Sequence, residues 1–403
     1  MDIYKESLKF HEEKKGKLAI SSKVAIKTKK DLSLAYTPGV AEACREIAKD
    51  ISNVYKYTIK QNTVAVVTDG SAVLGLGNIG AEAALPVMEG KCILLKEFAG
   101  VDAFPICIKT QDPKEIVDIV KNIAPVFGGI NLEDISAPRC FEIEEKLQDI
   151  GIPVFHDDQH GTAIVVLAAL KNALKVVGKK LEYVKVVVSG AGAAGISVAK
   201  MLTCANVEEN ICVSVRDVLC VDSEGIISKN RKRLNPFKKE IAKTTNKENV
   251  DGTLADAMKD ADVFVGVSAP NIVTREMVKS MNKKAIVLAM ANPVPEIMPD
   301  EALKGGAAIV GTGRSDFANQ VNNVLAFPGI FRGALDAEAV RITPEMKHAA
   351  AQTLARLVVP SKERILPSPL NKKVAQVIAE AVKKKAIEQG VVREPNGHFK
   401  TKT

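Results

Sequence analysis

Two pairs of adjacent carboxylates stand directly after short apolar segments in the first half of the sequence. Glu133 and Asp134 follow the segment Gly-Ile-Asn-Leu, and Asp157 and Asp158 follow Ile-Pro-Val-Phe-His. Carboxylates at the ends of buried strands are costly unless they are paired or bound to a metal. Two groups of hard oxygen ligands without cysteine are typical of Mg²⁺ or Mn²⁺ and not of Zn²⁺. The pattern therefore predicts a divalent-cation site.

Each acidic pair also has a plainer interpretation, as a helix cap or as the partner of a basic side chain. The metal interpretation gains weight if the chain also binds a dinucleotide. His156 and His160 flank the second pair. Because Mg²⁺ prefers oxygen ligands, we expect these two histidines to have structural or supporting roles.

A glycine-rich turn near the middle of the chain has the pattern of a dinucleotide-binding site. Gly190, Gly192 and Gly195 form GxGxxG directly after the strand-like segment Lys185–Ser189, with Ala193 and Ala194 between the last two glycines. Small residues let the backbone approach a pyrophosphate, and the free N–H groups of the following helix bind it. We therefore predict that these five residues contact the cofactor.

The residue that holds the ribose is less clearly marked. Asp222 ends the next strand-like segment, but it lies further along the chain than the usual ~20 residues, so Asp217 is kept as a competitor. A second GxGxxG, at Gly75, Gly77 and Gly80, is separated from its preceding strand by several residues. We interpret this second copy as a structural loop that lines a cleft.

The elements that must position these residues predict an α/β protein. Between about 181 and 315, strand-like runs at 185–189, 218–222, 263–267, 285–289 and 307–310 alternate with helical stretches such as 193–204 and 274–281. This alternation predicts a Rossmann-like, doubly wound parallel sheet. Residues 1–160 read as an N-terminal α/β substrate domain, with strand candidates at 63–68, 92–95 and 104–108. We place the dinucleotide domain at 161–330, starting with a helix over 162–177, and a helical C-terminal segment at 331–403.

Composition excludes several classes of protein. Tryptophan is absent and aromatic residues make up only 4%, which disfavours a base-stacking nucleic-acid surface despite the net charge of +8. The longest apolar run, 163–170, is far short of a membrane span, and the N-terminus lacks the features of a signal or transit peptide. The seven scattered cysteines contain no CxxC pair, so we expect reduced thiols and a cytoplasmic location.

Eight sequence blocks together give the chain a clear likeness. From about residue 16 to about 350, it resembles the short bacterial-type malic enzymes. The blocks are Tyr36-Thr-Pro-Gly-Val40, Val73-Leu-Gly-Leu-Gly-Asn-Ile-Gly80, Pro86-Val-Met-Glu-Gly-Lys91, Gly129-Ile-Asn-Leu-Glu-Asp134, Phe155-His-Asp-Asp-Gln-His-Gly-Thr162, Ser189-Gly-Ala-Gly192, Ala291-Asn-Pro293 and Asn319-Gln-Val-Asn-Asn-Val324.

The resemblance implies a role for each matching residue. Tyr36 matches the general acid and Lys91 the general base, with Asp157 beside them in the site. Asn292 and Asn323 match amides that hold the substrate, and Asn292 also lies near the nicotinamide. The matching metal ligands are Glu133, Asp134 and Asp158.

The implied reaction is the oxidative decarboxylation of (S)-malate to pyruvate and CO₂ with NAD or NADP and with Mg²⁺ or Mn²⁺. The resemblance also implies a possible decarboxylation of oxaloacetate and, for a short form of the family, a homodimer. For this chemistry the pKa of Lys91 must be lowered by burial and a neighbouring cation. The alternative is a metal-independent dehydrogenase of the amino-acid type, which needs a lysine but not the three acidic ligands.

Overall fold

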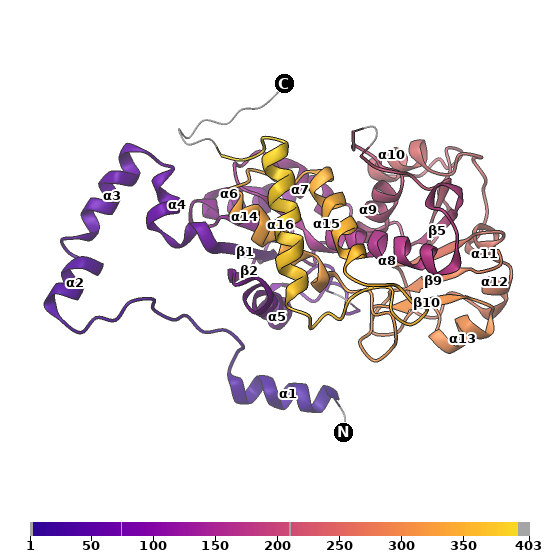
Figure 1. The fold of residues 1–403 in the computed structure, drawn as a ribbon, viewed down its shortest axis with the longest axis horizontal. Coiled ribbons are helices and arrows are strands. Elements are labelled where there is room, and N and C mark those ends of the chain that lie inside the picture. Colours follow the sequence, from indigo (N-terminus) through magenta and orange to yellow (C-terminus); the bar gives the residue numbers. More distant parts are fainter. Residues whose placement is uncertain (1–2, 74, 209–210, 394–403) are drawn as a thin grey trace.

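Two separate sheets form the centre of the molecule, and they lie in the two regions where the sequence predicts them (Figure 1). The structure is a computed structural model that describes residues 3–73, 75–208 and 211–393. The first sheet has the order β2-β1-β3-β4, and all its pairs are parallel. Its strands are β1 (Thr63–Thr68), β2 (Asp102–Cys107), β3 (Gly129–Leu132) and β4 (Val154–His156).

The second sheet confirms the predicted doubly wound architecture. Its order is β10-β9-β8-β5-β6-β7, parallel except for the short edge strand β7. Neighbouring residues of one strand enter different cores: Val186 and Val188 belong to one cluster and Val187 to another, so both faces are covered. The strands are β5 (Lys185–Ser189), β6 (Asp217–Asp222), β7 (Gly225–Ile226), β8 (Val263–Gly266), β9 (Ile286–Ala289) and β10 (Ile309–Thr312).

Helices cover the two faces of this second sheet and connect its strands. Their bounds are α9 (Ala193–Leu202), α10 (Pro236–Thr244), α11 (Leu254–Met258), α12 (Arg275–Lys279) and α13 (Pro299–Lys304). The predicted helix at 193–204 and the shorter one at 274–281 are thus confirmed as α9 and α12.

One strand prediction in the first domain is wrong. Residues 92–95 lie inside α5 (Ala81–Ala99), which also contains Pro86. The buried residues Ala84, Met88, Cys92 and Leu95 follow one another at intervals of three or four, so they form one face of a helix. Two further helices of this domain are α6 (Pro113–Ile123) and α7 (Arg139–Leu147).

A buried helix, α8 (Thr162–Val177), packs between the two domains and contacts α9 and α15. Among the described residues, the helical stretch 157–177 is the one segment long and apolar enough to cross a membrane, and 72% of its apolar window is buried in the protein. It therefore serves here as a core helix.

The C-terminal helices are α14 (Phe327–Asp336), α15 (Pro344–Arg356) and α16 (Lys373–Glu388). They pack mainly against the first domain and α8: α14 contacts α5 and α16, and the ring of Phe331 meets that of Phe155 on β4 at 5.9 Å. The domain boundaries at 160 and 330 stay predictions, and the end of the predicted C-terminal segment, 394–403, lies outside the described residues.

The N-terminal region differs from the rest of the molecule because it extends away from the body (Figure 1). We call residues 18–52 the arm. It contains α2 (Lys29–Ala35) and α3 (Val40–Lys49), preceded by α1 (Ile3–Lys14) and followed by α4 (Asn53–Tyr57). No residue of α1, α2 or α3 is buried.

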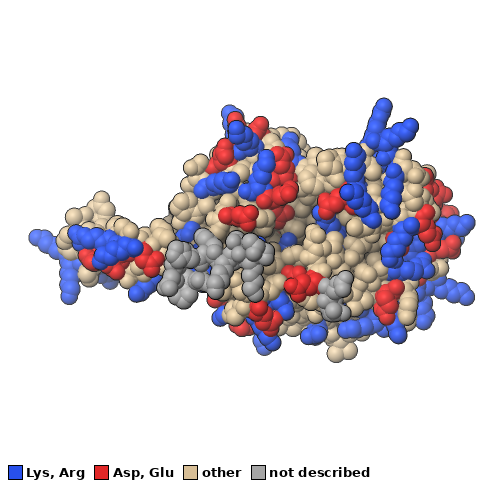
Figure 2. All heavy atoms as spheres, turned by 90° about the horizontal axis from the view of Figure 1, so that it is seen from above, with Lys and Arg blue, Asp and Glu red and all other residues tan. Residues whose placement is uncertain are grey.

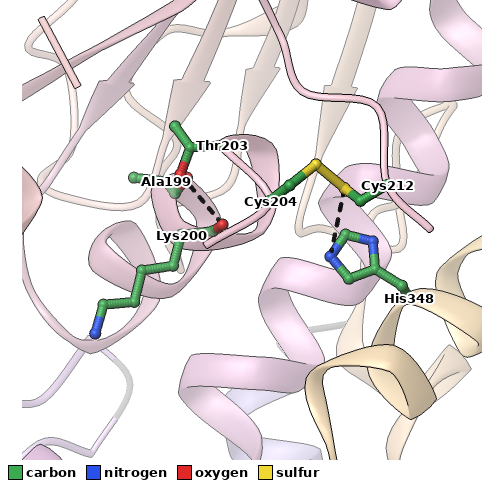
Figure 3. Close-up of a disulfide and its surroundings, with 6 residues drawn as sticks. All are labelled: Ala199, Lys200, Thr203, Cys204, Cys212 and His348. Carbon is green, nitrogen blue, oxygen red and sulfur yellow. Dashed lines mark hydrogen bonds between the residues drawn. A yellow bond between two sulfur atoms is a disulfide. The ribbon is translucent and has the colours of Figure 1, made fainter. Parts of the chain in front are cut away.

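The expectation of reduced thiols throughout is wrong for one pair of cysteines. Cys204 and Cys212 form a disulfide behind the C-terminal end of α9, with Cα atoms 5.8 Å apart, and His348 of α15 contacts Cys212 (Figure 3). No CxxC pair marks these two cysteines, because eight positions separate them in the chain. The other five cysteines are free, and the cytoplasmic location stays a prediction.

Candidate active site

The two acidic pairs meet at the carboxyl-end edge of the first sheet. Glu133 and Asp134 follow β3, and Asp157 and Asp158 follow β4. These strands pair in parallel with Leu132 opposite His156, so the residues that follow them emerge side by side. Carboxylate oxygens of Glu133, Asp134 and Asp158 all lie within 4.8 Å of one another. The backbone N–H of Asp134 donates to Asp158 Oδ2 at 2.8 Å, which fixes the two turns together.

These three carboxylates fit a divalent cation. Asp134 Oδ2 is buried and accepts no hydrogen bond, which is costly unless a ligand reaches it. Burial, reinforced by the charge of Asp158, raises the pKa of Asp134 to about 9. Burial likewise raises the pKa values of Glu133 and Asp158. A cation at this position would relieve the repulsion among three carboxylates in one buried place.

Lys91 reaches this cluster from α5. Its Nζ lies 2.8 Å from Glu133 Oε1 and 2.7 Å from Asp157 Oδ2, and it also lies over the ring of Phe327. Lys91 is only 8% exposed. Burial alone lowers its pKa, but the charges of Asp157 and Glu133 outweigh burial and raise it. The predicted lowering is therefore not observed, because the nearest charges are carboxylates.

Asn323 and Asn292 occupy different parts of the site. Asn323 donates from Nδ2 to Asp157 Oδ2 at 2.6 Å, so it holds the carboxylate that pairs with Lys91. Asn292 follows β9, and its backbone lies close against Gly75, where a Cβ atom would meet Asn292 O at 2.7 Å. The second glycine motif thus lies against the region after β9.

The predicted dinucleotide turn joins β5 to α9. Gly190 has φ +107°, and a side chain at Gly195 would collide with Gly190 O, so both positions require glycine. Gly192 is the N-cap of α9 and has open space around its missing Cβ. Ala193 and Ala194 form the first helical positions. Free N–H groups at this small-residue turn suit a pyrophosphate.

The two candidate ribose ligands lie at opposite ends of β6. Gly190 N–H donates to Val221 O, which places Asp222 beside the glycine turn, whereas Asp217 pairs with Lys185 at the far end of β5. Asp222 accepts hydrogen bonds from Arg231 Nη1 at 2.8 Å and Lys238 Nζ at 2.6 Å. Burial acts to raise the pKa of Asp222, but these two hydrogen bonds lower it.

Tyr36 lies apart from all these residues. It occupies the turn between α2 and α3 in the arm, and 67% of its surface is exposed. The structure therefore brings the predicted base, the acidic residues and Asn323 together and leaves the predicted acid outside.

A hydrogen-bond network around residues 157–161 was not predicted from the sequence. The residues 157–161 form a π-helical turn, η3, rather than a plain loop. Glu144 of α7 accepts a hydrogen bond from Gln159 Nε2 at 3.0 Å and contacts His160 Nε2 at 2.7 Å. Ser197 of α9 donates to Gln159 Oε1 at 3.3 Å. Two members of the network, Gln159 and His160, lie in the block Phe155–Thr162. Glu144 lies in none of the eight blocks, so the sequence contained no signal for it.

Together, the doubly wound sheet with its glycine turn and the adjoining lysine–carboxylate cluster define a class, the NAD(P)-dependent oxidoreductases. Family comparisons are more specific: residues 14–148 match "Malic enzyme, N-terminal domain" and residues 159–387 match "Malic enzyme, NAD binding domain". The chain belongs to the malic enzyme family, as its sequence blocks suggested.

Individual relatives agree over nearly the whole chain. The chain is 56% identical to the bifunctional malic/malolactic enzyme of Bacillus subtilis, over 98% of this chain and 95% of that protein. It is 55% identical to the NAD-dependent malic enzyme of Geobacillus stearothermophilus, over 94% and 79%. The crystal structure of the NAD-dependent malic enzyme of Thermotoga maritima has a TM-score of 0.89 at 50% identity and covers 94% of this chain and 98% of its own.

Proposed function

We propose that the protein oxidises and decarboxylates (S)-malate to pyruvate and CO₂, with NAD or NADP as hydride acceptor and Mg²⁺ or Mn²⁺ as the metal. The observation that carries this proposal is the contact of Lys91 with Asp157 and Glu133 beside a three-carboxylate cluster. Relatives named as NAD-dependent and as NADP-dependent malic enzymes support either dinucleotide.

Each residue of the cluster has a task in this reaction. When bound by Glu133, Asp134 and Asp158, a divalent cation supplies Lewis-acid polarisation of the substrate oxygens, and the bound dinucleotide accepts the hydride. Lys91 takes the proton of the malate 2-hydroxyl as a neutral amine, a form that a bound cation would favour because it offsets the carboxylate charges that raise the Lys91 pKa. Asp157, oriented by Asn323 and by Lys91 itself, keeps the ammonium at a fixed position.

The proton balance requires an acid in the last step of the reaction. After CO₂ leaves, C3 of the resulting enolpyruvate must gain one proton, and Tyr36 donates it from its hydroxyl. Lys91 gains one proton from the malate hydroxyl, and Tyr36 loses one proton to C3. Transfer of the proton from Lys91 to the Tyr36 oxygen returns both residues to their starting protonation states. The same residues would allow decarboxylation of added oxaloacetate.

The deciding experiment is an initial-rate assay with malate and Mn²⁺, using NAD and NADP in turn. We expect pyruvate formation with at least one dinucleotide and no activity after thorough treatment with EDTA, because three carboxylates beside malate's own would repel it without a cation. Malate oxidation that survives EDTA would contradict the metal role.

The alternative, a metal-independent dehydrogenase of the amino-acid type, gives a different result in the same assay. Oxidation of an amino acid in the presence of EDTA would support it. The clustering of Glu133, Asp134 and Asp158 counts against it, since such an enzyme has no use for three convergent carboxylates.

We also propose that the protein is a homodimer. The C-terminal helix α16 buries Val374, Ile378 and Val382 within the chain and leaves Val377 and Ile387 exposed. The arm leaves its apolar residues exposed and is therefore the segment that a second copy would cover. Light scattering at micromolar concentration tests this, and a monomer would contradict it.

A further inference from the structure

A cavity lies next to the π-helical turn η3 and apart from the residues assigned to the reaction. Its volume is about 410 Å³, within the range of pockets that hold small molecules. It is lined by α7, by residues 196–201 of α9, by α10 and by the first turns of α15. Of the described residues in the acidic cluster and in the glycine turn at 190–195, none lines it. The cavity is therefore distinct from the substrate and dinucleotide sites proposed above.

One side chain of the wall is an ammonium group without a partner. Lys347 is half-buried, and among the described residues no hydrogen bond or ion pair reaches its Nζ. Burial lowers the pKa of Lys347 to about 8, so it stays mainly charged at neutral pH. Lys200, the other lysine of the wall, pairs with Glu240 at 3.1 Å. Burial lowers the pKa values of His160 and His348 to about 4, so Lys347 offers the one uncompensated positive charge among the described residues of the wall.

Much of the remaining wall is apolar. The ring centroids of Phe141 and Phe237 lie 4.6 Å apart, and Ile196, Met201 and Ile342 add aliphatic surface. Aromatic side chains are large contact surfaces for a flat apolar group. A ligand that fits this wall therefore has an aromatic body and one anionic group that reaches Lys347.

The charges around the cavity count against a ligand with several negative groups. Glu145 and Glu240 line the cavity as well, and they would repel a second or third anionic group. Figure 2 looks down on the molecule from the α10 side of Figure 1, and basic and acidic side chains lie close together there instead of forming a patch of one sign. No broad positive field would therefore attract a polyanion from this side.

The cavity shares its wall with the residues that hold η3. Gln159 and His160 of this turn line it. Their partners Glu144 and Ser197 line it too, at distances of 2.7 to 3.3 Å from them. Asp158, a proposed metal ligand, belongs to the same turn. A molecule in the cavity would thus contact the residues that orient a metal ligand without reaching the metal itself.

We propose that this cavity binds a small monocarboxylate with an aromatic body, and that the bound molecule strengthens cation binding at the three-carboxylate cluster. Its carboxylate pairs with Nζ of Lys347, and its ring packs against Phe141 and Phe237. Filling the cavity restrains η3, so less ordering is left for the cation to impose. The second part rests on the proposed function, because it requires the metal role of the cluster, whereas the first part does not.

Calorimetric titration of the full chain with 3-phenylpropionate tests the first part. We expect saturable binding of one molecule per chain. Acetate and 3-phenylpropanamide should bind at least about tenfold more weakly, because acetate lacks the ring and the amide lacks the charge that Lys347 accepts. Equal binding of the acid and its amide, or no binding of the acid at millimolar concentration, overturns the proposal.

Lys347→Met tests the assignment of the charged partner, and Lys171→Met is its matched control. Lys171 is also half-buried and its pKa is also lowered by burial, but it lies on α8 outside the cavity. Lys347→Met should weaken binding of 3-phenylpropionate by about 10- to 100-fold, and Lys171→Met should leave it unchanged. Equal affinities of the two variants overturn the assignment. The comparison of acid and amide on the unaltered chain does not depend on how either variant folds.

Titration of Mn²⁺, followed by electron paramagnetic resonance of the free ion, tests the second part without an activity measurement. With saturating 3-phenylpropionate we expect Mn²⁺ to bind about fivefold more tightly, and by reciprocity the acid to bind about fivefold more tightly with Mn²⁺. The difference should vanish in Lys347→Met. An Mn²⁺ affinity that the acid leaves unchanged, or changes equally in Lys347→Met, overturns the coupling. A chain that binds no Mn²⁺ at all would instead overturn the metal role in the proposed function.

Discussion

In the proposed reaction, the interior site and the arm carry the two ends of one proton path, yet the two regions are built in opposite ways. Lys91 is 8% exposed and bound to two carboxylates, whereas Tyr36 is 67% exposed and lies on a segment without buried residues. Packing within the chain determines the position of Lys91. The arm has no buried residues in α2 or α3, so packing does not determine the position of Tyr36 in this way. The difference shows that packing within the chain determines the surroundings of Lys91 but not those of Tyr36.

Lys91→Ala should have the largest effect. We expect kcat/KM for malate to fall by about 10⁴-fold, because the base is lost and Asp157 and Glu133 keep unpaired buried charges. Nucleotide affinity should stay near that of the wild type, since Lys91 lies in the first domain. Steady-state rates and dinucleotide titration measure both.

The control for this variant is Lys60→Met. Lys60 is the other buried lysine of the first domain, and it donates to backbone carbonyls of Ala124 and Phe127 rather than to the site. This variant should lose stability and keep its turnover per folded molecule. A Lys91→Ala variant that keeps more than about a tenth of kcat/KM would refute the base assignment.

Tyr36→Phe should come next, with overall turnover lower by about 10²–10⁴-fold. Only a hydroxyl is removed, so the folding free energy should change by no more than ~1 kcal/mol. Reduction of pyruvate by the reduced dinucleotide needs no proton at C3 and should suffer much less. Stopped-flow absorbance of the reduced nicotinamide and tritium exchange at C3 of pyruvate separate the two steps. Equal losses in both would assign Tyr36 to substrate positioning instead.

Phe331→Ala and Leu34→Ala compare the two regions directly. Phe331 is fully buried against Phe155, so its removal should cost about 3–5 kcal/mol of unfolding free energy. Leu34 is 67% exposed, and its removal should change the unfolding of the body by less than ~0.5 kcal/mol. If a second copy covers the arm in the proposed homodimer, Leu34→Ala should instead raise the dissociation constant of the dimer. Denaturant titration and concentration-dependent light scattering measure the two quantities.

Glu144→Gln should have the smallest effect on the reaction. Glu144 holds the π-helical turn through Gln159 and His160, and burial acts to raise its pKa while His160 lowers it. Its conversion to an amide should weaken Mn²⁺ binding by about 10- to 100-fold, as for other residues that orient metal ligands. Glu142→Gln, an exposed change on the same helix that affects only an ion pair with Lys146, is the matched control. Equal Mn²⁺ affinities for the two variants would remove Glu144 from the metal site.

Short-range patterns in the sequence determined several strands and helices and the glycine-rich turn. Strands at 63–68 and 185–189, the buried helix 162–177, the glycine turn at 190–195 and the acidic pairs all follow from local periodicity and from which residue types tolerate a turn or a strand end. Parallel pairing then brings Glu133 and Asp157 to one edge of the sheet, a consequence that could be predicted without coordinates.

Other features depended on contacts between residues that are far apart in the chain. The segment 92–95 is apolar enough for a strand, and only its place on the buried face of α5 makes it helical. Cys204 and Cys212 form a disulfide because their Cα atoms lie 5.8 Å apart, although eight positions separate them in the chain. Glu144 contacts Gln159 and His160 of the π-helical turn because α7 packs beside it.

The position of Tyr36 could not be predicted from the sequence. Its block of residues matches a family motif, and the predicted role of Tyr36 as the general acid rests on that match. The motif does not record where Tyr36 lies relative to Lys91, because local residue types do not encode the relative placement of segments that are far apart in the chain. The tertiary structure leaves the arm extended and its apolar side chains uncovered, with Tyr36 67% exposed.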